Sequence, residues 1–179
     1  TLTQIADAAH MAANVSHGEE PGLAAIGQFG TSFSTFSNGC HICEIEIDPE
    51  TGVSTIDRYT IVDDLGMVIN PMLLTGQVQG GTIQGIGQAL FEGCRYQEDD
   101  GQIVTGSFMD YCLPRADNVP FIDFQVLDDM PCKTNPMGMK GAGEVGAIGA
   151  PPAVVNALLD AMSGIGIHNI DMPATPEKV

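Results

Sequence analysis

Tryptophan is absent from this chain of 179 residues, and positively charged side chains are scarce. Six Lys and Arg residues stand against 23 Asp and Glu residues, so the formal net charge at pH 7 is −17. Binding to a nucleic-acid backbone or to an anionic membrane surface depends on clustered Lys and Arg. The composition therefore argues against both partners, and the excess of acidic residues is most simply a source of solubility.

Long apolar runs and a secretory leader are also lacking. We find no stretch that approaches the roughly 18 consecutive apolar residues of a membrane helix, and residues 1–4 show no leader pattern. The first residue is not Met, so we expect a piece of a longer protein. The five cysteines are odd in number and scattered, which is typical of a reducing compartment. We expect a cytoplasmic protein without a membrane span.

What is present is a mixture of strand and helix patterns. Residues 43–47 alternate apolar and acidic side chains, and the Asp-Pro-Glu-Thr-Gly turn at 48–52 leads into a second strand at about 53–63. The other predicted elements are a strand at 121–128 and helices at 4–14, 76–92 and 151–162. Because strands and helices do not alternate strictly, we predict an α+β fold, with a mixed or antiparallel sheet packed against a few helices, as a single domain over 1–179.

The sequence predicts where two helices begin and raises a question about the interior of a third. Thr3 is the predicted cap of the first helix, and Pro151-Pro152 is predicted to open the last one. The interior of the helix at 76–92 contains Gly80, Gly81, Gly85 and Gly87, each of which costs about 1 kcal/mol relative to Ala in a helix interior. Such a segment has another backbone or a ligand close by. The sequence leaves both explanations open.

Glu144 is the strongest candidate for a catalytic residue in this sequence. It lies in the run 140–152 among small and apolar residues, far from any basic residue after Lys140. A carboxylate in a poorly hydrated site has a raised pKa and becomes a candidate base. A solvated loop acid is the commoner role of such a residue. The flanking glycines and the positive end of the following helix favour the candidate base.

Two motifs suggest functions that their contexts do not support. Residues 141–146 match GxGxxG, but that dinucleotide motif follows a buried strand and opens a helix directly, whereas we expect the helix only at Pro151. Cys40 and Cys43 have the spacing of zinc ligands, but a structural zinc site needs a second pair, and none exists. Residues three apart on a strand also point to opposite faces. We predict ordinary strand cysteines and no metal ligand in this chain.

Several blocks of sequence, in order along the chain, form a pattern that is specific when they are taken together. These blocks are residues 38–39, 44–52, 62–66, 69–71, 76–81, 84–90, 140–144 and 171–179. Together they resemble the C-terminal part of the molybdenum-binding large subunit of the xanthine oxidase and aldehyde oxidase family, and the resemblance covers essentially the whole chain. The sequence of the blocks is more similar to that of aerobic carbon monoxide dehydrogenase large chains than to that of purine-oxidising members.

The resemblance assigns roles to four residues. It implies that the chain is part of a molybdopterin-binding domain, and that Glu144 is the general base that takes a proton during the reaction. Gln77 would hydrogen-bond the pterin. Asn70 and Lys140 lie in blocks that line the dinucleotide part of the cofactor.

The resemblance also implies a reaction, a cofactor and partners. The reaction is oxidative hydroxylation of a substrate C–H carbon, or oxidation of carbon monoxide, with water as the oxygen source. The cofactor of bacterial members is molybdopterin cytosine dinucleotide with molybdenum. Electrons leave through [2Fe-2S] clusters to FAD. The implied partners are the remaining part of the molybdenum subunit, an FAD-binding medium subunit, an iron–sulfur small subunit and a small-molecule substrate.

Two alternatives to this enzyme function remain. One is a non-catalytic structural or assembly module derived from the same family, and the other is a nucleotide-binding protein that uses the Gly-rich loops. For the enzyme, we expect the isolated chain to be inactive, because half of a cofactor cage cannot hold the metal.

Overall fold

The computed structural model of the chain describes residues 1–24, 26–31 and 33–179, which form two compact units, Thr1–Ser32 and Phe33–Val179. The first unit contains helix α1 (Leu2–His10) and a short 3₁₀ turn (Ala12–Asn14). The predicted cap at Thr3 is wrong. The Thr1 hydroxyl accepts a hydrogen bond from the Gln4 backbone N–H, and the Gln4 side chain returns to the Thr1 backbone, so a capping box starts the helix earlier.

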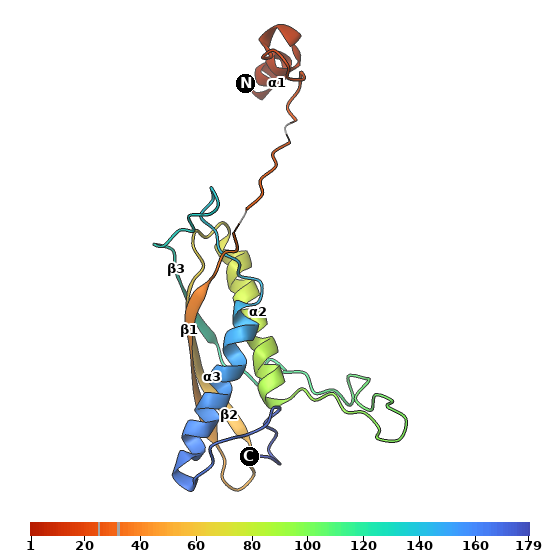
Figure 1. Ribbon diagram of the computed structural model, residues 1–179, viewed down its shortest axis with the longest axis vertical. Helices are drawn as coiled ribbons and strands as arrows, with labels where there is room; N and C mark the ends of the chain where they lie inside the picture. The colour runs from red at the N-terminus through yellow and green to blue at the C-terminus, as the bar shows by residue number, and fades with distance from the viewer. Residues whose placement is uncertain (25, 32) are drawn as a thin grey trace. The chain divides into compact units, whose positions relative to one another are not determined.

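The second unit is a three-stranded sheet with two long helices (Figure 1). The strands lie in the order β1-β2-β3, with β1 antiparallel and β3 parallel to β2. This arrangement confirms the predicted α+β fold with a mixed sheet. The elements are β1 (Asn38–Ile47), β2 (Ser54–Asp64), α2 (Pro71–Leu90), β3 (Ile122–Leu127) and α3 (Val145–Met162).

The core lies between the sheet and the two helices. Residues of β2 alternate between inward and outward positions from Tyr59 to Asp64, as expected for a strand with one buried face, whereas the register shift opposite Glu44 and Ile45 interrupts the alternation at Asp57 and Arg58. Fully buried side chains from β2, α2 and α3 meet there. They are Tyr59, Ile61, Val78, Thr82, Ile86, Val154 and Leu158.

Two glycines of α2, Gly81 and Gly85, are explained by close packing against the backbone of α3, so the first of the two explanations applies to them. A Cβ on Gly80 would meet nothing within 4 Å, and one on Gly87 would meet Glu92 and Pro114. A Cβ on Gly85 would lie 2.8 Å from both the Ala150 Cβ and the Pro151 Cδ of α3. Gly146 of α3 is tighter still, because its Cβ would lie 2.5 Å from the Thr82 backbone nitrogen and closer yet to the Val78 carbonyl oxygen. The backbones of α2 and α3 therefore touch with almost no side chain between them.

The predicted start of the last helix is wrong by six residues. Helix α3 begins at Val145, directly after Glu144, and Pro151 and Pro152 lie inside it. A proline in a helix interior cannot donate a backbone hydrogen bond, which normally ends or kinks the helix. The close contact of Gly146 and Ala150 with α2 holds the first turns in helical form in spite of that cost.

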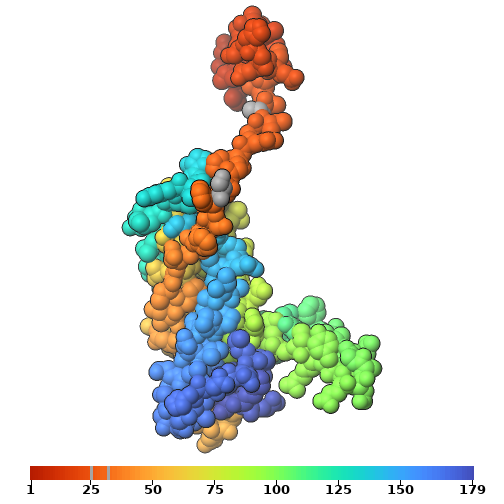
Figure 2. Space-filling view, viewed as in Figure 1, coloured from red at the N-terminus to blue at the C-terminus, as the bar shows by residue number. Residues whose placement is uncertain are grey.

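Helix α3 and the turn after it, Val145–Ile165, are long and apolar enough to cross a membrane by length and composition alone. The expectation that no segment would resemble a membrane helix was wrong. Polar residues interrupt the apolar run, but they do not lower the mean hydropathy of the segment enough to exclude it. One side of α3 packs against α2 and β1, and Figure 2 shows its other side at the surface beside β1. A helix buried on one side in this way is typical of a globular core.

Candidate functional site

Two of the four predicted site residues are brought together from distant parts of the sequence. The Gln77 side-chain nitrogen, on α2, donates a 2.6 Å hydrogen bond to the carbonyl oxygen of Gly143. Gly143 directly precedes Glu144. The contact fixes the residue directly before Glu144 against α2.

Glu144 occupies the N-cap position of α3 but does not cap it. Its backbone angles are φ −124° and ψ 6°, its side chain is exposed, and that side chain accepts no cap hydrogen bond. The N–H groups of the first turn are therefore left without a side-chain acceptor, which favours an anion at this end of the helix. Added Cβ atoms on Gly141 and Gly143 would meet nothing within 4 Å, so the loop backbone is accessible.

Lys140 anchors the loop that leads to Glu144. Its ammonium group donates a 2.5 Å hydrogen bond to the Asp64 carboxylate, and both side chains are largely buried. This hydrogen bond is the main reason why the pKa of Asp64 lies below its ordinary value. The Lys140 backbone N–H also donates to the Leu65 carbonyl. In this structure Lys140 ties the loop to the end of β2.

Asn70 lies at the start of α2 and caps it. Its side-chain oxygen accepts a 3.1 Å hydrogen bond from the Leu73 backbone N–H, and Pro71 takes the first helical position. Gln77 is seven residues further along, which corresponds to about 10 Å along the helix axis. The structure therefore gives Asn70 a capping role, at a distance from Gln77 and Gly143.

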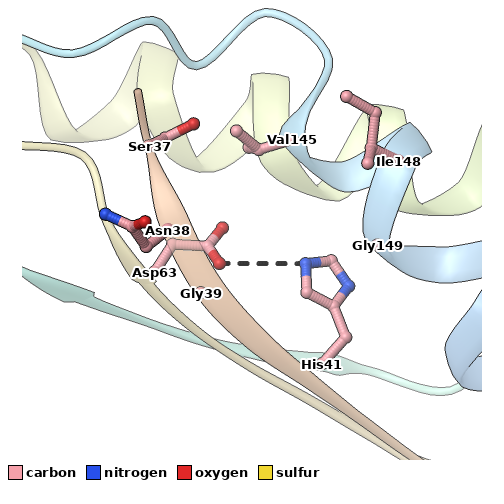
Figure 3. Close-up of a pocket in the computed structure, with 8 residues that line it drawn as sticks. All are labelled: Ser37, Asn38, Gly39, His41, Asp63, Val145, Ile148 and Gly149. Carbon is pink, nitrogen blue, oxygen red and sulfur yellow. Dashed lines mark ion pairs between the residues drawn. The ribbon is translucent and has the colours of Figure 1, made fainter. Parts of the chain in front are cut away.

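Sequence reasoning missed a buried polar cluster of His41, Tyr59 and Asp63, of which Figure 3 shows His41 and Asp63. The His41 Nδ1 lies 2.9 Å from the Tyr59 hydroxyl, and its Nε2 lies 3.8 Å from Asp63 Oδ1. A cavity of about 200 Å³ between β1 and α3 opens on this cluster and is also lined by Asn38 and Ile148. The available signal was alternation, since His41 and Asp63 sit at inward positions of their strands among apolar residues.

Burial sets the charge of the cluster. Burial raises the pKa of Asp63 to about 6 and lowers the pKa of His41. An ion pair would shift both values in the opposite directions, and 3.8 Å is too long for a hydrogen bond. The two pKa shifts therefore indicate that His41 and Asp63 do not form a stabilising ion pair. Among the described residues, none hydrogen-bonds to Asp63 Oδ2.

Asp63→Asn is expected to stabilise the chain at neutral pH and not in acid. The folded-state pKa is raised, so the stabilising proton on Asp63 is fully held below about pH 4 and is lost as pH rises through about 6. The resulting buried charge costs on the order of 3 kcal/mol, and asparagine avoids it. Urea unfolding followed by circular dichroism should show a gain of about 1–3 kcal/mol at pH 7.5 and none near pH 4.

The comparison must be made between variant and wild type at each pH, because His41 contributes with the opposite sign. Its pKa is lowered, so its contribution to stability is lost as pH falls below about 6.5. An equal gain from Asp63→Asn at both pH values would show that charge is not the cause.

The GxGxxG match at 141–146 needs a second assessment, because one argument against it was wrong. The helix follows this segment directly, instead of starting at Pro151. The other argument stands: β3 ends at Leu127, and residues before the motif form only an isolated bridge between Gly66 and Met139. Gly146 packs against α2 and does not face a ligand. The segment is therefore not a Rossmann phosphate loop.

The cysteine pair on β1 separates as predicted for a strand. Cys40 is exposed, whereas Cys43 is half-buried and packs against the core. In the part of the chain that the structure describes, no three His, Cys, Asp or Glu side chains gather in a way that could hold a metal ion.

Comparison with known proteins finds a family model and several relatives that match this chain. Residues 1–120 match the molybdopterin cofactor-binding domain family. The gamma subunit of the 6-hydroxypseudooxynicotine dehydrogenase complex of Paenarthrobacter nicotinovorans is 42% identical over 161 residues, which are 90% of this chain and 20% of that protein. The carbon monoxide dehydrogenase large chain of Afipia carboxidovorans is 36% identical over 86% of this chain and 19% of its own length.

Solved structures agree with these matches. The Cu,Mo-containing CO dehydrogenase, in its carbon monoxide-reduced state, superposes with a TM-score of 0.88 and 32% identity, over 99% of this chain and 22% of that one. The chain spans about a fifth of the length of the curated relatives it matches.

Proposed function

Because the chain belongs to the molybdopterin cofactor-binding domain family, with relatives among xanthine oxidase-type molybdenum subunits, we propose that it forms one wall of a molybdenum site. In this proposal Glu144 is the general base and Gln77 a pterin ligand. The observation that supports it best is the hydrogen bond from Gln77 to the carbonyl oxygen of Gly143, the residue directly before Glu144.

The residues of this chain could hold one side of a molybdenum–pterin cofactor. The uncapped first turn of α3 offers backbone N–H groups to an anionic, pterin-like ligand, and the open space around Gly143 lets a ligand approach the loop backbone. Gln77 can reorient its amide toward a ligand because it is exposed. The chain spans about a fifth of the length of its relatives, so the remainder of the cage would come from outside this chain.

Each residue has a role in the proposed reaction. The molybdenum–pterin group, when bound, supplies a two-electron oxidation of the substrate with oxygen from water. Glu144 accepts a proton at its carboxylate, for which a dry environment in the assembled enzyme would tune its basicity. Gln77 orients the pterin and holds the loop. Lys140, fixed by Asp64, keeps that loop at the end of β2.

The finer assignments are part of the same proposal. The cofactor is molybdopterin cytosine dinucleotide, with Asn70 and Lys140 near its dinucleotide part, and the electrons pass to [2Fe-2S] and FAD groups on partner subunits. The chain acts as a single C-terminal subdomain, residues 1–179, of a cytoplasmic bacterial enzyme. The substrate is a C–H compound or carbon monoxide, and the isolated chain is inactive.

A structural or assembly module is the second candidate function. It is favoured by the capping role of Asn70 and by the ion pair that occupies Lys140, since both side chains already have structural partners. A module of this kind would stabilise the assembled subunit without contributing a group to the reaction.

Gln77→Ala in the assembled complex separates these two functions. If Gln77 binds the cofactor and holds the loop, molybdenum and pterin content per complex should fall at least about 10-fold, the range in which loss of a supporting contact weakens a metal site. Gln84→Ala, an exposed glutamine on the same helix, is the matched control and should leave both contents unchanged. Equal cofactor content in both variants would contradict the proposed ligand role.

A further inference from the structure

The His41 imidazole packs directly against the backbone of α3. A Cβ on Gly149 would lie 2.6 Å from the Cε1 and Nε2 atoms of the ring and 2.7 Å from its Cδ2. The ring therefore fills the position where any side chain at residue 149 would stand. Glycine at 149 allows this edge of the imidazole to reach the second turn of the helix, as Figure 3 shows.

The orientation of the ring is fixed from the sheet side. The Tyr59 hydroxyl, on β2, is 2.9 Å from Nδ1, and the two rings meet edge to face with their planes at 86°. Tyr59 itself is fully buried, and Asp63, 2% exposed, stands on the Nε2 side. These contacts connect the middle of the sheet to one point on α3.

The contact at Gly149 is close to Glu144, the proposed base, because both residues lie along the rigid helix α3. Gly149 lies five residues after Glu144, which is about 7.5 Å along a helix axis. On its other side the same segment is held by Gly146 against the α2 backbone. The first turns of α3 are thus clamped between α2 and the imidazole, and a shift of the clamp moves Glu144.

We propose that His41 is a positioning residue for Glu144: supported by Tyr59 and Asp63, its ring sets the place of the first turns of α3 and so of the carboxylate. The inference rests on the proposed function of Glu144. The adjacent cavity explains why the support is needed, because about 200 Å³ of open space beside the ring would let an unsupported imidazole turn away from Gly149.

The test uses the complete molybdenum subunit in its assembled complex. His41→Ala removes the ring, and Tyr59→Phe removes only the hydroxyl that orients it. Ile42→Ala, at the neighbouring half-exposed position on the other face of β1, is the matched control. Three quantities are measured: molybdenum content, kcat and KM per bound molybdenum, and hydrogen exchange of the backbone over residues 141–149.

A misplaced general base lowers kcat without weakening substrate binding. We expect His41→Ala to reduce kcat per molybdenum by about 10- to 100-fold, since a shift of about 1 Å can cost that much, with KM changed less than about 3-fold. Exchange over residues 141–149 should become faster. Tyr59→Phe should show the same pattern with a smaller loss, about 3- to 10-fold, and Ile42→Ala should match the wild type.

Different results overturn different statements. Normal kcat per molybdenum in His41→Ala, beside an inactive Glu144→Gln enzyme, overturns the positioning role alone. An active Glu144→Gln enzyme overturns the proposed function and this inference with it. If His41→Ala fails to assemble, Tyr59→Phe decides, and unchanged kcat and exchange in that variant overturn the positioning role.

Discussion

Replacing Glu144 with Gln is expected to reduce turnover per bound molybdenum by about 10²- to 10⁴-fold, the range that a general base contributes. Glutamine has nearly the same shape but cannot accept the proton. The folded chain should not be affected, because the Glu144 side chain is exposed and makes no cap hydrogen bond. Molybdenum content, measured on the purified complex together with kcat, should equal that of the wild type.

Glu98→Gln is a suitable control, because Glu98 is an exposed acid in a turn remote in sequence from the proposed site. It removes the same charge and should leave turnover unchanged. If Glu144→Gln behaves like this control, Glu144 is a solvated loop acid, and the structural module becomes the better description of the chain.

Gly146→Ala is expected to destabilise the folded chain by at least about 3 kcal/mol, the upper part of the range for overpacked positions. Its new methyl group would overlap the Thr82 nitrogen and the Val78 carbonyl oxygen of α2, and backbone atoms in a helix cannot turn aside as side chains can. The helices would have to separate. Thermal and urea unfolding of the chain, followed by circular dichroism, measure the loss.

Gly80→Ala, on the same pair of helices, is expected to stabilise the folded chain. A Cβ at Gly80 would meet nothing within 4 Å, so the higher helix propensity of Ala should raise the free energy of unfolding by about 1 kcal/mol at most. A stable Gly146→Ala protein, with a midpoint as high as that of Gly80→Ala, would mean that α2 and α3 do not approach as closely as the structure shows.

The parts of the fold that local chemistry determines could be predicted from the sequence. The β1–β2 hairpin is one case: Asp48 accepts hydrogen bonds from Glu50 and Thr51, and Gly52 adopts φ +71°, as the Asp-Pro-Glu-Thr-Gly pattern indicates. The start of α3 could not be predicted in this way. It depends on Gly146 meeting α2, a contact between residues more than 60 positions apart, and that contact outweighs the helix-breaking effect of Pro151 and Pro152.

The candidate site shows the same division. Glu144 stands out in the sequence by its isolation among small residues, and the family resemblance gives it a role. The hydrogen bond between Gln77 and Gly143 spans 66 residues and has no local signature. His41 and Asp63 face each other because of the register of β1 on β2, which pairs Gly39 with Asp63 and His41 with Ile61. Register of this kind is fixed by the assembled sheet.

The glycine contact between α2 and α3 has a consequence for engineering the proposed site. Most helix pairs are separated by a layer of side chains that can exchange volume with one another when one of them is substituted. Here the two backbones touch, so a bulkier residue at Gly81, Gly85 or Gly146 translates one helix as a body and carries Gln77 or Glu144 with it. Libraries aimed at new substrates should therefore keep this helix pair constant and place their diversity elsewhere, so that the reacting groups keep their spacing while the walls around them change.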